Sequence, residues 1–76
     1  MESNEKNGER VINIFTAYNQ NKKVVSINLD EVAFWEEDVD KSFTVVHLKN
    51  PTDIIWIKVD EETFRKKYIE YKTLYK

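Results

Sequence analysis

The chain has 76 residues, contains no cysteine and carries a formal net charge of −2 at pH 7. This length fits one domain, in a size range where a single hydrophobic core gives a net stability of only about 3–5 kcal/mol. The absence of cysteine excludes a disulfide framework and Cys-based metal sites, and the weakly acidic charge gives no overall attraction to nucleic acid.

The first residues and the hydropathy pattern bear on where the protein acts. Residues from Met1 to Lys6 lack the basic and then apolar layout of a signal peptide, and no apolar run approaches the ~18 residues of a membrane span. We therefore expect a cytoplasmic protein. The polar segment 1–9, which contains the only glycine, is expected to be a disordered leader before a single domain at 10–76. The abundance of Lys, Asn, Ile and Tyr is typical of an AT-rich genome and suggests a bacterial or phage origin.

Four segments before residue 50 have the composition of β-strands. Val, Ile, Phe, Thr and Tyr are frequent in them, and polar turn-forming residues separate them. The expected strands are Arg10–Tyr18, Val24–Leu29, Val32–Glu36 (or a bent continuation of the second strand) and Phe43–Leu48. Between them lie a polar turn at 19–23, a bend at 30–31 and a loop at 37–42.

The stretch after residue 50 predicts a strand that runs directly into an amphipathic helix. A turn at 49–53 precedes the apolar, β-branched run Ile54–Val59. Asp60 is suited to cap the helix, because its carboxylate can accept hydrogen bonds from the unpaired amides of the first turn. Val59 and Phe64 have the spacing of a hydrophobic staple across that cap. The apolar stripe of the helix comprises Phe64, Tyr68, Tyr71 and Tyr75.

Together these elements predict an α+β fold, an antiparallel meander of four to five strands with one C-terminal helix packed on one face. The helix stripe is expected to cover alternating apolar residues of the strands. These are Ile55, Ile57, Val59, Val25, Ile27, Leu29, Val32 and Phe34, completed by either Val46 and Leu48 or Phe43 and Val45.

A single helix covers only one face of such a sheet, so the other face is the most informative feature of the sequence. We expect that face to carry Trp35, Trp56 and Ala33, together with His47. Soluble monomers rarely expose a large apolar patch, and tryptophan is enriched at interface hot spots. The candidate interface residues are Trp35, Trp56, His47 and, on the charged side of the helix, Ile69. The structural alternative is that the N-terminal strand covers this face, or that the sheet curls and buries both tryptophans.

Candidate catalytic and cofactor sites are weak in this sequence. His47 is the only histidine and lies in an expected strand, with no Ser/Asp arrangement that indicates a nucleophile. The acidic residues between Glu36 and Asp40 lack the spacing and the glycine of a calcium-binding loop. One glycine cannot form a glycine-rich phosphate-binding loop. We expect no enzyme activity, no cofactor and no metal.

Nucleic-acid binding is the alternative function. Basic residues interleaved with tyrosines can follow a phosphate backbone and stack on bases. The candidate contacts on the helix are Arg65, Lys66, Lys72 and Lys76. The tyrosines, however, lie on the stripe that is expected to face the core, and neighbouring glutamates dilute the positive charge. Because the apolar stripe is expected to pack on the sheet, docking of this helix on a membrane surface is also disfavoured.

The run from Val25 to Phe34 (VSINLDEVAF), followed by a strand pair and then by DEETF at 60–64, resembles the first part of the LytTR domain of bacterial response regulators. It also resembles the short flagellar FlbD-type proteins. Both families open with a strand, a bend and a meander that leads to a helix, so the resemblance implies a small bacterial or phage β-meander. The basic segments with which LytTR domains read DNA have no counterpart here, and no functional residue carries over.

The sequence therefore predicts a small non-enzymatic regulatory module that binds a protein through an aromatic sheet face or a sheet edge. Two kinds of partner are compatible with this prediction. One is a second copy of the chain, which would give a homodimer, and the other is a different protein that the module inhibits or regulates.

Overall fold

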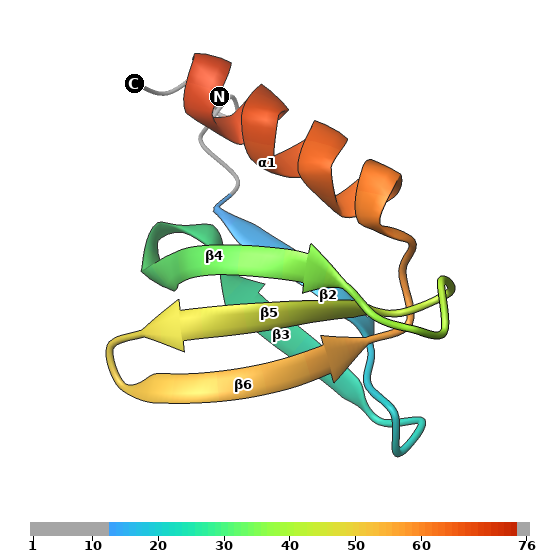
Figure 1. Cartoon of the computed structure of the whole chain (residues 1–76). Coiled ribbons are helices and arrows are strands. Elements are labelled where there is room, and N and C mark those ends of the chain that lie inside the picture. Colours follow the sequence, from blue (N-terminus) through green and yellow to red (C-terminus); the bar gives the residue numbers. More distant parts are fainter. Residues whose placement is uncertain (1–12, 75–76) are drawn as a thin grey trace, which may run out of the picture.

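The computed structural model describes residues 13–74 as five antiparallel strands, a short 3-10 helix and one C-terminal α-helix (Figure 1). The elements in chain order are β2 (Ile14–Tyr18), β3 (Val24–Asn28), η1 (Leu29–Glu31), β4 (Val32–Glu37), β5 (Thr44–Lys49), β6 (Thr52–Ile57) and α1 (Glu61–Leu74). The predicted α+β class, with antiparallel strands followed by one helix, is confirmed. The expected leader at 1–9, the first part of the first strand, Tyr75 and Lys76 lie outside the described residues.

The strands form two sheets. β2 pairs with β3, and β4, β5 and β6 form a second sheet in that order. An antiparallel bridge between Asn19 and Ile57 connects them, and the Lys58 N–H donates to the Tyr18 carbonyl at 2.7 Å. In Figure 1 the β2–β3 hairpin lies behind the three-stranded sheet, and α1 crosses above β4. The three-stranded sheet therefore has one face toward the hairpin and another face directed away from it.

The hydrophobic core lies between the two sheets and α1. Its buried members are Ile27, Leu29, Val32, Val46, Ile57 and Phe64. Of the two pairs left open by the sequence, Val46 and Leu48 are the pair that packs in this core. Thr44 lies on the same side of β5 and is fully buried, and its hydroxyl donates to the Val59 carbonyl at 2.7 Å. The buried hydroxyl of Thr44 therefore has a hydrogen-bond partner.

Helix α1 begins as the sequence predicts. The Asp60 carboxylate accepts a hydrogen bond from the Thr63 N–H at 3.2 Å and another from the Thr63 hydroxyl at 2.7 Å. Val59 packs against the core cluster to which Phe64 belongs, in agreement with the staple spacing. The cap and the staple together fix the direction in which the chain leaves β6, so the apolar stripe of α1 faces the sheets.

The last strand begins and ends two residues earlier than predicted. The expected strand Ile54–Val59 is observed as Thr52–Ile57, because Lys49 pairs with Thr52 directly across a turn at Asn50–Pro51. At its other end the chain leaves the ladder to enter the helix cap. The bend predicted at 30–31 is confirmed as the 3-10 helix η1, which separates β3 from β4.

Among the described residues, four carboxyl groups have a lowered pKa because they accept hydrogen bonds in their ionised form. The pKa of each is lowered chiefly by one side-chain donor: Thr63 for Asp60, Ser42 for Asp40, Trp35 for Glu61 and Tyr71 for Asp30. A hydrogen bond to the charged form of a carboxyl lowers its pKa, and these hydrogen bonds exist in the folded chain but not in the unfolded chain. These groups therefore link the stability of the fold to pH.

We expect the free energy of unfolding to fall in acid. Because the folded pKa of each carboxyl is lowered, its contribution is complete above the ordinary values of 3.8 for Asp and 4.5 for Glu, and is lost as the pH falls through the lowered value. Urea unfolding followed by circular dichroism should give a lower midpoint at about pH 3 than at about pH 7. The difference should be smaller in Asp60→Asn, and equal midpoints at both pH values would contradict the prediction.

Candidate functional site

The three-stranded sheet has one side directed away from the core, and six side chains in the middle of the sheet lie on that side. The register places them in two rows across β4, β5 and β6. In Figure 1 no described element crosses in front of this side of the sheet. We call it the outer face; its rows are Phe34, His47 and Ile54, and then Glu36, Val45 and Trp56.

The first row is built around a stacked aromatic pair. The rings of Phe34 and His47 are 4.0 Å apart between centroids and inclined by 14°. His47 is half-buried, and its Nε2 lies 2.9 Å from the Glu36 carboxylate. Phe34 remains 53% exposed and Ile54 45% exposed. The row therefore presents an apolar surface whose aromatic part is held in place by a stack and a hydrogen bond.

The second row adds Trp56 beside Val45. Val45 is buried although it lies on the outer side of β5 and does not belong to the main core cluster. Trp56 is half-buried and occupies the position directly across from Val45 on β6. The predicted placement of Trp56 and His47 on the face away from the helix is confirmed.

The prediction that Trp35 lies on this face is wrong. The register shifts between Val32 and Phe34: Val32 pairs with Leu48, whereas Phe34 pairs with His47, so two steps along β4 match one step along β5. Such a bulge reverses the alternation of side chains beyond it. Phe34, which was expected in the core, lies on the outer face, and Trp35 lies on the inner side.

Trp35 instead joins the sheet to the helix. Its ring contacts Phe64 at 5.1 Å and Tyr68 at 4.9 Å between centroids. Its indole N–H donates to the Glu61 carboxylate at 3.0 Å, and Glu61 also accepts from Arg65 at 3.2 Å. The two tryptophans thus have different surroundings: Trp35 packs under α1, and Trp56 lies on the outer face.

Sequence reasoning missed the two large exposed apolar residues of the outer face, Phe34 and Ile54. The signal for Ile54 is present, because it lies two positions before Trp56 in one strand and must share its side. No local signal marks Phe34, since its orientation depends on the bulge. Ile69, the remaining candidate, is 52% exposed on α1 and does not belong to this face.

The basic residues of α1 are largely engaged with acidic neighbours on the same helix. Arg65 pairs with Glu61, Lys66 with Glu62 at 3.3 Å, and Lys67 with Glu70 at 3.8 Å. The Lys72 ammonium lies over the rings of Tyr68 and Tyr71, at 5.5 and 5.8 Å from their centroids. Lys76 lies outside the described residues. The helix therefore presents mixed charge, which is a poor match for a phosphate backbone.

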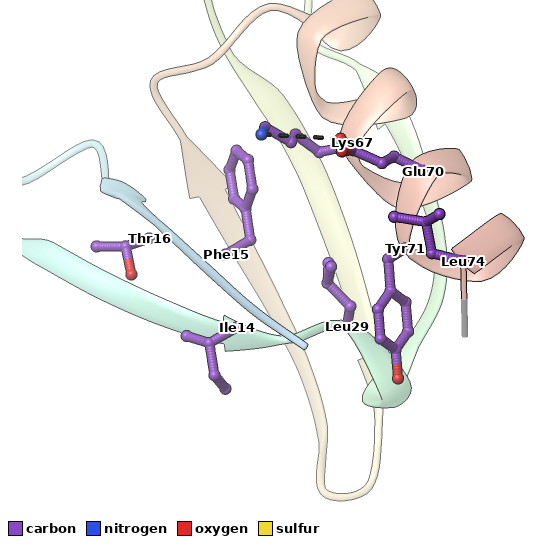
Figure 2. Close-up of a pocket in the computed structure, with 8 residues that line it drawn as sticks. All are labelled: Ile14, Phe15, Thr16, Leu29, Lys67, Glu70, Tyr71 and Leu74. Atoms are coloured by element: carbon purple, nitrogen blue, oxygen red, sulfur yellow. Dashed lines mark ion pairs between the residues drawn. The ribbon is translucent and has the colours of Figure 1, made fainter. Parts of the chain in front are cut away.

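A groove of about 470 Å³ separates β2 from the C-terminal half of α1 (Figure 2). Phe15, Leu29 and Tyr71 point into the space between the elements, whereas Ile14 and Thr16 point away from the helix. The Tyr71 hydroxyl donates to the Asp30 carboxylate, which ties α1 to η1. The lining residues come from β2, η1 and α1, so the groove is part of the junction between the helix and the hairpin.

Comparison with models of known protein families, with curated protein sequences and with solved structures found no match to this chain. Helix α1 has 14 residues, and the described part of the chain contains no helix long and apolar enough to cross a membrane. Within residues 13–74, no three His, Asp or Glu side chains gather closely enough to hold a metal ion.

Proposed function

We propose that this chain is a small non-enzymatic regulatory module that binds a protein through the outer face. The observation that supports the proposal best is the exposure of Phe34 and Ile54 beside Trp56 on a sheet side that no described element covers. Contiguous apolar patches on soluble domains commonly mark interaction sites. Aromatic residues are also enriched where protein interfaces gain most of their binding energy.

The construction of the outer face favours binding in a second way. Its side chains project from three paired strands, and the Phe34 ring is already stacked on His47. A surface that is ordered before binding loses less conformational entropy when a partner docks. The only histidine of the chain therefore serves to orient an apolar surface, which fits a binding role better than a catalytic one.

A site-specific photo-crosslinker tests the proposal. Benzoylphenylalanine in place of Phe34 should form covalent adducts with a protein when it is irradiated in the cells that express the chain. The same group in place of Ile69, which is similarly exposed but lies on α1, serves as the matched control and should form far fewer adducts. Trp56→Ala should remove the adducts formed from position 34 while circular dichroism of the helix is unchanged.

Two results would contradict the proposed function. The first is an equal yield of adducts from positions 34 and 69, which would mean that the outer face has no preference for protein. The second is an adduct pattern that Trp56→Ala leaves intact although that variant is folded. Either result would remove the outer face from consideration as a binding surface.

A further inference from the structure

One end of the outer face carries a negative charge beside β4 and a positive charge beside β6. Past the strand ends, the row after Trp56 comprises Asp38, Phe43 and Lys58, of which Phe43 and Lys58 also line a hollow with residues of the β2–β3 turn. The Asp38 N–H donates to the Phe43 carbonyl at 3.2 Å, and the Lys58 ammonium lies 5.6 Å from the centroid of the Phe43 ring. This end of the face therefore runs from a carboxylate beside β4 to an ammonium beside β6.

We infer that the partner of the outer face is a second copy of this chain, packed face to face about a two-fold axis that runs along β5. The inference rests on the proposed function and names the partner for that same surface. A two-fold axis makes each contact twice, because the same patch is used by both copies. Packed sheets commonly keep their strands within about 30° of each other, which such an axis permits.

This axis places unlike groups opposite each other. It brings β4 of one copy over β6 of the other, so that Phe34 meets Ile54 and the acidic end of β4 meets the basic end of β6. Lys58 then lies over Asp38 of the other copy, and Glu36 lies one row away, over Trp56. Within residues 13–74 Lys58 forms no ion pair, although its charge contributes to lowering the pKa of Asp40 in the adjacent loop.

A two-fold axis across the strands fits less well. It keeps each strand over its own copy and reverses the order of the rows. Glu36 would then lie over the Phe34 ring, and Lys58 would lie over Thr52, so neither charge would meet an opposite one. Charge complementarity therefore selects the axis along β5.

The size of the face predicts a dissociable dimer. Three strands about 4.8 Å apart, with rows about 7 Å apart along them, give a surface on the order of 300–400 Å² per copy. Stable complexes bury roughly 800 Å² per partner, so the dimer should form only at high micromolar concentration. The two rows of the outer face and the two charge contacts made by Lys58 would hold the two copies in one relative orientation.

Charge reversal tests this arrangement. In analytical ultracentrifugation up to about 1 mM, the wild-type chain should show a reversible monomer–dimer equilibrium. Asp38→Lys and Lys58→Glu should each raise the dimer Kd at least about tenfold, since each places like charges together twice. An equimolar mixture of the two variants should dimerise about as well as wild type, because both contacts are then between opposite charges. Glu62→Lys on α1 changes the net charge as much as Asp38→Lys and should leave the Kd unchanged.

The outcomes separate this inference from the proposed function. A wild-type chain that stays monomeric throughout, or variants that fail to complement each other in the mixture, would overturn the second-copy arrangement. If adducts from position 34 then contain a different protein and still depend on Trp56, the proposed function stands with another partner. A monomer that also gives no Trp56-dependent adduct would contradict both.

Discussion

Replacing Phe64 with alanine is expected to unfold a large fraction of the molecules at room temperature. The Phe64 side chain is fully buried, and its ring contacts Phe15 at 5.2 Å and Trp35 at 5.1 Å between centroids. Truncating a buried phenylalanine costs about 3–5 kcal/mol, from lost transfer free energy and the cavity that remains. A domain of this size has a net stability of about the same magnitude. The one substitution therefore removes about as much free energy as the fold has available.

Urea unfolding monitored by circular dichroism measures this effect. Ile69→Ala is the matched control, because it truncates an apolar residue of the same helix that is 52% exposed. It should change the free energy of unfolding by no more than about 0.5 kcal/mol. A Phe64→Ala variant that loses less than about 1 kcal/mol would contradict the position of Phe64 at the centre of the core.

The two tryptophans should respond very differently to truncation. Trp35→Ala is expected to lower the free energy of unfolding by about 3 kcal/mol, because it removes the contacts with Phe64 and Tyr68 and leaves Glu61 without its indole donor. Trp56→Ala should cost about 1 kcal/mol or less, since it shortens a half-buried side chain on the outer face. The same variant should nevertheless abolish binding through that face.

Denaturant unfolding of both variants, followed by far-ultraviolet circular dichroism, compares them directly. Each variant retains one tryptophan, so fluorescence emission reports on the other residue in its own surroundings. Trp35→Phe provides a control that keeps an aromatic ring and should recover much of the lost stability. Equal destabilisation by the two alanine variants would mean that the tryptophans share one environment, in conflict with the bulge in β4.

The helix and its start could be predicted because their causes are local. An Asp60 cap, a staple between Val59 and Phe64 and a stripe of aromatic residues all depend on neighbours within about one turn of the chain. The order of the elements and the α+β class follow from the same kind of information, since alternation and helical spacing are visible in sequence. The placement of Trp56 and His47 on one side of the sheet also follows from alternation within unbroken strands.

The candidate site was predicted only in part, and the reason lies in β4. Alternation read from Val32 assigns Phe34 to the core and Trp35 to the outer face, which is the reverse of what is observed. The one-residue bulge that reverses it has no glycine or other local signal in the sequence. Its position is set by the pairing of β4 with β5, whose partner residues at the bulge lie 13 to 16 positions further along the chain.

The sequence by itself determined the fold class, the helix with its cap and the existence of an apolar sheet side that the helix does not reach. Only the tertiary structure decided which aromatic residues occupy that side and how the strands divide into a hairpin and a three-stranded sheet. The physical reason is the range of the interactions. Caps, turns and periodicity act between near neighbours, whereas the register at Val32 and the bridge from Asn19 to Ile57 depend on contacts between distant segments.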